Sequence, residues 1–279
     1  MEPSFHSRTF DPHELRIRTW RRVQHMIHPP RRRPRDPQIS EHRLDLPRLP
    51  RGMAGMRVVH LSDIHYGLYL SRSSLSRLID LTLALEPDLI AMTGDFVTQS
   101  PAFIEPVCEM LGHLRAPLGI YAVLGNHDFR AGAENVTREL RRRNIHVLRN
   151  THMHLKTPAG TIKIAGIDDS RQHPDLNAAL SPHNPDDFTI LLAHNPVALE
   201  AASAASVDFV MSGHTHGGQI KFGFAENWYQ RHAPEGFLQH GLTRMYVSRG
   251  IGQVILPVRY GCPPELAAFE LHPATTRKQ

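Results

Sequence analysis

Short apolar blocks alternate with longer amphipathic segments from residue 56 onward, and this pattern predicts an α/β protein. In the early part, strands alternate with helices, which favours buried parallel strands. The later strands follow one another closely and favour a mixed sheet, so two facing sheets with helices outside would satisfy both parts. The predicted strands are 56–61, 88–92, 119–124, 161–167, 188–193, 207–211, 244–248, 254–258 and 265–271, and the predicted helices are 71–85, 101–114, 133–143 and 196–205.

The first 51 residues differ from the rest and are predicted to form an N-terminal arm before one domain, residues 52–279. Residues 11–28 fit an amphipathic helix with Trp20 on its apolar side and Arg18, Arg21 and Arg22 opposite. A basic amphipathic helix with Trp is typical of membrane-surface binding, so the arm predicts a peripheral contact with an anionic membrane. A solvated arm and a helix docked on the body are the alternatives.

The net charge of +5 is concentrated in this arm, which holds twelve arginines and six acidic residues. An arginine-rich arm also suits nucleic acid, but no interleaved aromatic residues mark a single-strand groove, so nucleic acid is not the favoured partner. The sequence contains no run of 18 apolar residues, so it predicts no membrane-spanning helix. No apolar segment follows the arginine pairs, so a cleaved secretory signal is not expected. Because Cys108 and Cys262 cannot form a disulfide framework, we expect a cytoplasmic protein, peripheral on the inner membrane through its arm.

Five polar clusters follow one another along the body, most of them just after an apolar block. Asp63 and His65 are two residues apart at a strand end, as are His214 and His216, so each pair turns its side chains to one face. A carboxylate such as Asp95 is suited to bridging two ions. The full set of candidate ligands is Asp63, His65, Asp95, Asn126, His194, His214 and His216.

These side chains offer the oxygen and nitrogen ligands of two divalent ions, for which Mn²⁺, Fe²⁺ and Zn²⁺ are all suitable. Two ions about 3.5–4 Å apart lower the pKa of a shared water, hold a hydroxide nucleophile and bind phosphoryl oxygens. His127, beside Asn126, is the candidate general acid for the leaving oxygen. The clusters therefore predict metal-assisted hydrolysis of a phosphate ester.

At these residues the chain resembles the calcineurin-like metallophosphoesterase superfamily, whose pattern is Asp-x-His, Gly-Asp, Gly-Asn-His-Asp or Glu, a lone His, and Gly-His-x-His. The resemblance implies a four-layer αββα sandwich with two facing mixed β-sheets, and it implies that His127 is the catalytic histidine. It also implies two metal ions. The first would be held by Asp63, His65, Asp95 and His216, and the second by Asp95, Asn126, His194 and His214, with Asp95 bridging.

Departures from the superfamily pattern narrow the branch. Thr98 stands where purple acid phosphatases have tyrosine, so a redox iron centre is not expected. His127 stands where the proteobacterial UDP-diacylglucosamine pyrophosphohydrolases usually have arginine. Segments 212–220, 246–252 and 257–265 resemble a bacterial phosphodiesterase branch, some of whose members are membrane-associated.

The resemblance implies a phosphodiesterase or pyrophosphohydrolase, and the basic arm favours a lipid-linked substrate. The alternatives are a UDP-2,3-diacylglucosamine pyrophosphohydrolase of lipid A synthesis, a cyclic-nucleotide phosphodiesterase, and a non-enzymatic scaffold on the same fold. The complete ligand set disfavours the scaffold. Arg259 is a candidate contact to substrate phosphate, with a salt bridge or a turn as its alternative role.

Overall fold

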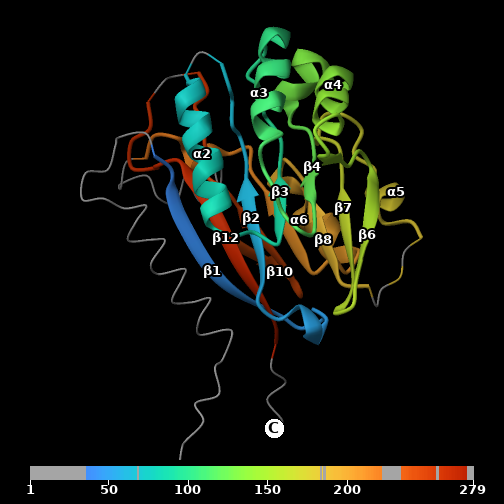
Figure 1. Cartoon of the computed structure of the whole chain (residues 1–279). Coiled ribbons are helices and arrows are strands. Elements are labelled where there is room, and N and C mark those ends of the chain that lie inside the picture. The colour runs from blue at the N-terminus through green and yellow to red at the C-terminus, as the bar shows by residue number, and fades with distance from the viewer. Residues whose placement is uncertain are drawn as a thin grey trace, which may run out of the picture. The chain divides into compact units, whose positions relative to one another are not determined.

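Two six-stranded mixed β-sheets face each other in the computed structural model (Figure 1). The structure describes residues 36–67, 69–182, 184, 187–221, 234–255 and 258–274. The helix predicted over residues 11–28 therefore lies outside the described residues. The α/β class and the pair of mixed sheets agree with the sequence prediction.

The first sheet combines both ends of the described chain with its early strands. Parallel pairing joins β2 to β3, β3 to β4 and β4 to β5, whereas β12 runs antiparallel to β2 and parallel to β1. In spatial order the strands are β1 (Gln38–Leu46), β12 (Glu265–Pro273), β2 (Met56–Leu61), β3 (Leu89–Met92), β4 (Ile120–Ala122) and β5 (His146–Val147).

The second sheet is built from the later strands and has a parallel centre. The pairs β7–β8, β8–β9 and β9–β11 are parallel, and an antiparallel strand closes each edge. In spatial order the strands are β10 (Gly236–His240), β11 (Thr243–Val247), β9 (Phe209–Ser212), β8 (Thr189–Leu192), β7 (Gly160–Gly166) and β6 (Thr151–Thr157).

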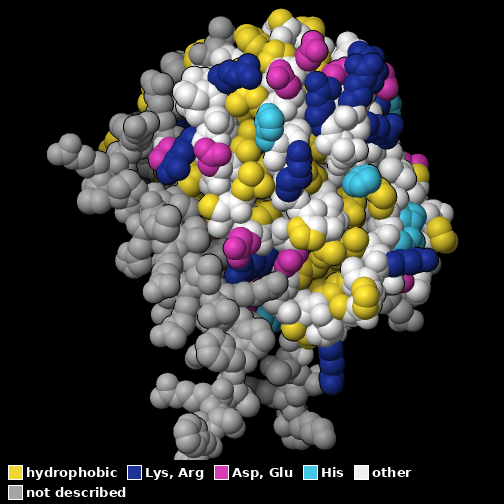
Figure 2. Space-filling model, viewed as in Figure 1, with side chains coloured by type: hydrophobic (Ala, Val, Ile, Leu, Met, Phe, Trp, Pro, Cys, Tyr) yellow, Lys and Arg dark blue, Asp and Glu magenta, His cyan; other side chains and the backbone are white. Residues whose placement is uncertain are grey.

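Helices cover the outer faces of both sheets and complete the four layers. The first sheet carries α2 (Arg72–Ala84), α3 (Ile104–Leu111) and α4 (Asn126–Arg141) on the face seen in Figure 1. The second carries α5 (Leu176–Leu180) and α6 (Leu199–Ala204), with short 3-10 turns η1 (Arg51–Met53), η2 (Pro101–Phe103), η3 (Pro196–Ala198) and η4 (His216–Gly218) between elements. Figure 2 shows basic side chains gathered over α4. No helix in the described ranges is both long and apolar enough to cross a bilayer.

The main core lies between the sheets. It joins alternate residues of the first sheet, such as Val58 and Phe269, to residues of the second, such as Ile164, Ile190 and Phe209. A second cluster packs the opposite faces of β8 and β11 against α5 and α6. Since each fully buried aliphatic or aromatic side chain contributes about 1.5–3 kcal/mol, these two layers fix the sheets and hence their edges.

The N-terminal boundary of the body differs from the sequence prediction. Residues 38–46, assigned to the arm, form β1 and pair with β12 along nine residues. The sequence QISEHRLDL gave no strand signal because β1 is an edge strand, with several partly exposed positions and only its last residues deeply buried. The body therefore begins before residue 52.

Other elements match the predicted segments with shifted ends, and a few do not. The helix predicted over 133–143 begins at Asn126, because Gly132, with φ 123°, interrupts α4 without ending it. The strand predicted over 254–258 is wrong, since Val254, Ile255 and Val258 lie outside any strand. β5, β6, β10 and α5 were not among the predicted segments.

Candidate metal centre

The candidate ligands lie where parallel strands of the two sheets end. Asp63 follows β2 and Asp95 follows β3, while His194 follows β8. Asn126 opens α4 directly after the loop that leaves β4, and His214 and His216 follow β9. Parallel strands present their carboxyl ends at one edge of a sheet, which is where such folds place binding loops. The packed sheets therefore bring segments more than 150 residues apart into one site.

The backbone at the site adopts an uncommon conformation. Asp63, His65, Asp95, His214 and His216 all have left-handed φ angles between 47° and 72°. Non-glycine residues rarely occupy this region, and each such residue carries a strain of about 1–3 kcal/mol. Five of the seven candidate ligands share this conformation, so the loops at the site hold their ligands in a strained backbone.

Glycines allow the ligand loops to approach closely. A Cβ on Gly213 would lie 1.9 Å from Ser62 Oγ and 2.2 Å from Asp63 Oδ2. A Cβ on Gly125 would lie 2.2 Å from Asp95 Oδ1. Because neither position has room for a side chain, these glycines set the separation of the loops across the site.

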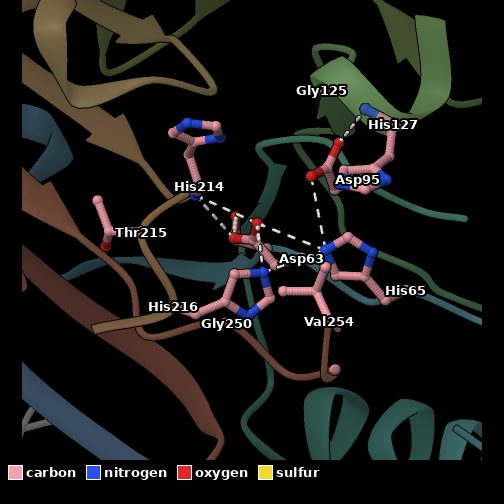
Figure 3. Close-up of polar contacts among 12 residues, drawn as sticks. Asp63, His65, Asp95, Gly125, His127, His214, Thr215, His216, Gly250 and Val254 are labelled. Atoms are coloured by element: carbon pink, nitrogen blue, oxygen red, sulfur yellow. Dashed lines mark hydrogen bonds and ion pairs between the residues drawn. The ribbon is translucent and has the colours of Figure 1, made fainter. Parts of the chain in front are cut away.

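One cluster joins Asp63, His65 and His216, all buried (Figure 3). His65 Nε2 lies 3.1 Å from His216 Nε2, and His216 Nε2 lies 3.4 Å from Asp63 Oδ1. The Asp63 carboxylate also accepts from the backbone N–H of His214, at 3.2 and 3.0 Å, which ties β2 to β9.

A second cluster joins Asp95, His194 and His214. His194 Nε2 lies 3.3 Å from Asp95 Oδ2 and 3.1 Å from His214 Nδ1. His194 Nδ1–H donates to the carbonyl of Thr93 at 2.6 Å, which orients the ring so that Nε2 faces Asp95 and the centre.

Asp95 stands between the two clusters. The same oxygen, Oδ2, lies 3.5 Å from His65 Nε2 in the first cluster and 3.3 Å from His194 Nε2 in the second. A single buried carboxylate oxygen therefore faces both ligand groups, an arrangement that suits a bridging ligand.

Burial and neighbouring charges set the protonation of these groups. Burial lowers the pKa of His216 to about 3, and the charge of Arg259 adds to this effect, so the ring stays neutral. Burial opposes ionisation of His194, but the charge of Asp95 and a hydrogen bond to it raise the pKa to about 10. Burial likewise opposes ionisation of Asp95, yet the nearby His194 holds its pKa far below the usual range. Two buried carboxylates facing mostly neutral imidazoles make an electrostatic site for cations.

The positions of the ligand atoms by themselves fit divalent metal ions. Asn126 Oδ1 is buried without a hydrogen-bond partner, as an acceptor reserved for a cation would be. The nitrogen pairs His65–His216 and His194–His214 each stand 3.1 Å apart, where a shared cation would satisfy both lone pairs. Carboxylate, imidazole and amide ligands suit borderline divalent ions.

His127 lies at the edge of the centre on the first turn of α4. Its backbone N–H donates to Asp95 Oδ1 at 2.8 Å, and its ring meets that of His65 edge-on, with centroids 4.9 Å apart. Its Nδ1–H donates to the carbonyl of Thr98. Because Nδ1 is committed, Nε2 is the atom that can exchange a proton with a substrate.

Asp128 is the structurally important residue to which the sequence analysis gave no role. Its carboxylate accepts from the backbone N–H groups of Asp95, Phe96, Val97 and Gly125, at 2.7–3.3 Å. It thereby fixes the Asp95 loop against the start of α4. The Gly-Asn-His-Asp motif contained the signal, since a carboxylate three residues after a helix N-cap accepts exposed backbone N–H groups.

Arg259, the candidate phosphate contact, makes several hydrogen bonds within the protein. Its guanidinium donates to the carbonyls of Gly252, Arg249 and Gly250 and lies 3.1 Å from His216 Nδ1. These acceptors come from the loop after β11, so Arg259 holds that loop against the back of His216. The backbone carbonyls thus supply the acceptors of the role in a turn that the sequence analysis gave as the alternative, and the phosphate contact stays a prediction.

A chain of buried hydrogen bonds supports Asp63 from behind. His60 Nε2 lies 2.8 Å from Thr93 Oγ1, which donates to Ser62 Oγ at 2.7 Å. Ser62 Oγ in turn donates to Asp63 Oδ2 at 2.6 Å. The chain links β2 and β3 to the first cluster and orients its carboxylate.

Comparisons with known proteins agree with this geometry. The chain matches the family described as calcineurin-like phosphoesterase over residues 56–218, which include all seven candidate ligands and His127. It is 33% identical over 243 residues to the uncharacterized metallophosphoesterase YkuE of Bacillus subtilis, covering 84% of this chain and 85% of that protein. It is 30% identical over 256 residues to the Bos taurus transmembrane protein with metallophosphoesterase domain, covering 85% of this chain but only 58% of the relative.

A solved structure shows likeness in fold alone. The Thermus thermophilus sulfate thiohydrolase SoxB, in complex with glycerol, aligns with a TM-score of 0.50 at 14% identity. The alignment covers 81% of this chain and 58% of that one.

Proposed function

We propose that this chain, which belongs to the calcineurin-like phosphoesterase family, is a metal-dependent phosphodiesterase or pyrophosphohydrolase. The observation that carries the proposal is the pair of three-residue ligand clusters that meet at Asp95 Oδ2. The family supports hydrolysis of a phosphoric ester. The preference for a diester or pyrophosphate comes from the likeness of segments 212–220 and 246–252 to the phosphodiesterase branch.

The residues of the site divide the work of hydrolysis. One divalent ion would be held by Asp63, His65 and His216. A second ion would be held by His194, His214 and Asn126. Asp95 would bind both ions. Such ions supply activation of water and stabilisation of charge on the phosphoryl oxygens. His127 would hold a proton at Nε2 and deliver it to the leaving oxygen, because Nδ1 is fixed by Thr98.

The test is hydrolysis of bis(p-nitrophenyl) phosphate with added Mn²⁺. We expect Asp95→Asn to abolish turnover, since it removes charge from both clusters, and His127→Ala to lower kcat by about 10²–10⁴-fold. His154→Ala is a matched control, because His154 has the same His-x-His spacing, with His152, but lies on the exposed side of β6. Retained turnover in Asp95→Asn would overturn the proposal.

The non-enzymatic scaffold remains the competing function. Metal analysis of the purified chain, together with the assay above, distinguishes the scaffold from the enzyme. Stoichiometric metal with turnover supports the enzyme, whereas metal-free, inactive protein that gains no activity with Mn²⁺ supports the scaffold.

The membrane contact of the N-terminal arm also remains a proposal. The test is a pull-down with anionic liposomes and with DNA, using the full chain and a chain lacking residues 1–35. It shows whether the arm binds an anionic membrane, nucleic acid or neither of them. The truncation ends before β1 so that the first sheet is kept whole.

A further inference from the structure

A loop that contributes no candidate ligand packs against the first cluster. This 249–252 loop follows β11, and two of its backbone N–H groups donate to the carbonyls of Ser62 and Asp63, at 3.0 and 2.7 Å. Gly250 lies so close to Asp63 that a Cβ on the glycine would stand 2.7 Å from the Asp63 Cβ (Figure 3). The loop therefore supports Asp63 in its left-handed backbone conformation, with φ 52°.

The 249–252 loop also contacts the histidines of the first cluster. A Cβ on Gly252 would stand 2.8 Å from the Cβ of His65. Arg259, whose guanidinium donates to carbonyls of the loop, lies 3.1 Å from His216 Nδ1. Within the described part of the chain, no hydrogen bond joins the loop to the histidines of the second cluster. A displaced loop would therefore disturb the ligands of the first ion more than those of the second.

Glu265, the first residue of β12, holds the 249–252 loop in place. Its carboxylate accepts from the backbone N–H of Arg249 at 3.1 Å and from the Arg249 guanidinium at 2.9 Å. Its own backbone N–H donates to the carbonyl of Gly250 at 3.0 Å. The Glu265 side chain is only 3% exposed. Because hydrogen bonds between charged groups are roughly twice as strong as neutral ones, this buried carboxylate fixes the start of the loop firmly.

The other donors to Glu265 come from β1 and β11. Ser40 Oγ of β1 donates to Glu265 Oε1 at 2.5 Å, and the Tyr246 hydroxyl of β11 donates to the same oxygen at 2.9 Å. Gln38, also in β1, accepts from the Arg249 guanidinium at 3.3 Å. Glu265, Arg249 and β1 all lie outside residues 56–218, so the family match assigns them no role.

We infer that Glu265 is a positioning residue for the first ion of the metal centre. Through Arg249 it fixes the 249–252 loop, and the loop holds Asp63 and His65 in the backbone conformation that brings their side chains into one cluster. The inference rests on the two-ion centre of the proposed function. Residues that support metal ligands from behind change metal affinity by about 10–100-fold, which sets the size of the effect.

Calorimetric Mn²⁺ titration of Glu265→Gln tests the inference. Glutamine keeps the size of glutamate but replaces one accepting oxygen with an NH₂ group, which cannot accept from Arg249. We expect the affinity for one ion to fall by about 10–100-fold, while the other ion binds within about threefold of the wild-type affinity.

Two further variants identify the weakened site. His216→Ala removes a ligand of the first cluster, so adding Glu265→Gln to it should leave the affinity of the remaining ion unchanged. Glu270→Gln lies further along β12, where its carboxylate contacts His272, and should bind both ions as the wild type does. An equal loss at both sites in Glu265→Gln would show that Glu265 only stabilises the fold. That result, or wild-type affinity at both sites, overturns the inference.

Ser40→Ala gives a milder test if Glu265→Gln does not fold. The substitution removes one donor to Glu265 at a partly exposed position and keeps the carboxylate. The loss of one hydrogen bond should weaken the first ion by about fivefold and leave the second unchanged. Unchanged affinity for both ions in Ser40→Ala would then overturn the inference.

Hydrogen exchange of the metal-free chain separates this inference from the proposed function. In Glu265→Gln, the two loop amides that donate to Ser62 and Asp63 should exchange at least about tenfold faster, while the amides of β8 should exchange as in the wild type. Faster exchange of the loop, together with no Mn²⁺ binding by the wild type, would refute the two-ion centre but support the positioning of Asp63 by Glu265. Unchanged exchange of the loop amides overturns the inference whether or not Mn²⁺ binds.

Discussion

Replacing Thr93 by valine tests whether the hydrogen-bond chain behind Asp63 organises the metal centre. Valine keeps the shape of threonine but removes the hydroxyl that links His60 to Ser62. The backbone carbonyl of Thr93, which accepts from His194, is retained. The substitution therefore breaks the chain at its middle and leaves the ligands themselves in place.

The expected magnitude follows from the two groups left behind. His60 Nε2–H loses its acceptor while fully buried, which costs about 1–3 kcal/mol, and Ser62 Oγ loses a donor at about 1 kcal/mol. A total of about 2–4 kcal/mol lowers Tm by roughly 5–15 °C in a domain of this size. Because Ser62 then orients Asp63 less firmly, Mn²⁺ affinity should fall by about 10–100-fold.

Thermal unfolding by circular dichroism and calorimetric Mn²⁺ titration measure the two effects. Thr93→Ser restores the hydroxyl and should recover most of the metal affinity. Thr82→Val removes a buried hydroxyl in α2, far from the chain, and should leave affinity unchanged. If the Mn²⁺ affinity of Thr93→Val is within about twofold of the wild-type affinity, the hydrogen bonds from His60 through Thr93 to Ser62 have no part in positioning Asp63.

Three further predictions follow from the packing of the site. Gly213→Ala should abolish metal-dependent turnover, because its Cβ would clash with Ser62 and Asp63. Gly236→Ala is the control: its left-handed φ of 74° strains alanine, but no atom lies within 4 Å of its Cβ, so it should stay active. An active Gly213→Ala would refute the close-approach argument. Deletion of residues 1–35 should leave a cooperative thermal transition, whereas deletion of residues 1–50 removes β1 and should lower Tm strongly; equal Tm values would show that β1 is dispensable. Burial lowers the pKa of His60 to about 4, below its unfolded value of 6.5, so stability is complete above pH 6.5 and falls as pH drops towards 4. Urea unfolding between about pH 7 and about pH 5 should show wild type losing roughly 2 kcal/mol more than His60→Gln, and equal losses would contradict the assignment.

The sequence was sufficient to select candidate ligands because metal ions favour particular ligand types. Asp63, Asp95 and His194 were recognisable from local patterns: a carboxylate or imidazole placed just after an apolar strand. The central strands β2, β3, β8 and β9 were equally visible, because buried parallel strands are continuous apolar runs. The edge strand β1 was missed, since its pairing partner β12 lies more than 200 residues away and its own pattern is polar.

What the sequence by itself determined is which side chains are candidate metal ligands and which layers surround them, because both depend on residue type and short-range period. Only the tertiary structure decided that one oxygen of Asp95 faces both clusters, that Arg259 braces His216, and that Glu265 holds the loop beside Asp63. These features depend on distances between loops from different strands. Such distances are set by the packing of two sheets, to which residues along the whole chain contribute, and no local pattern encodes them.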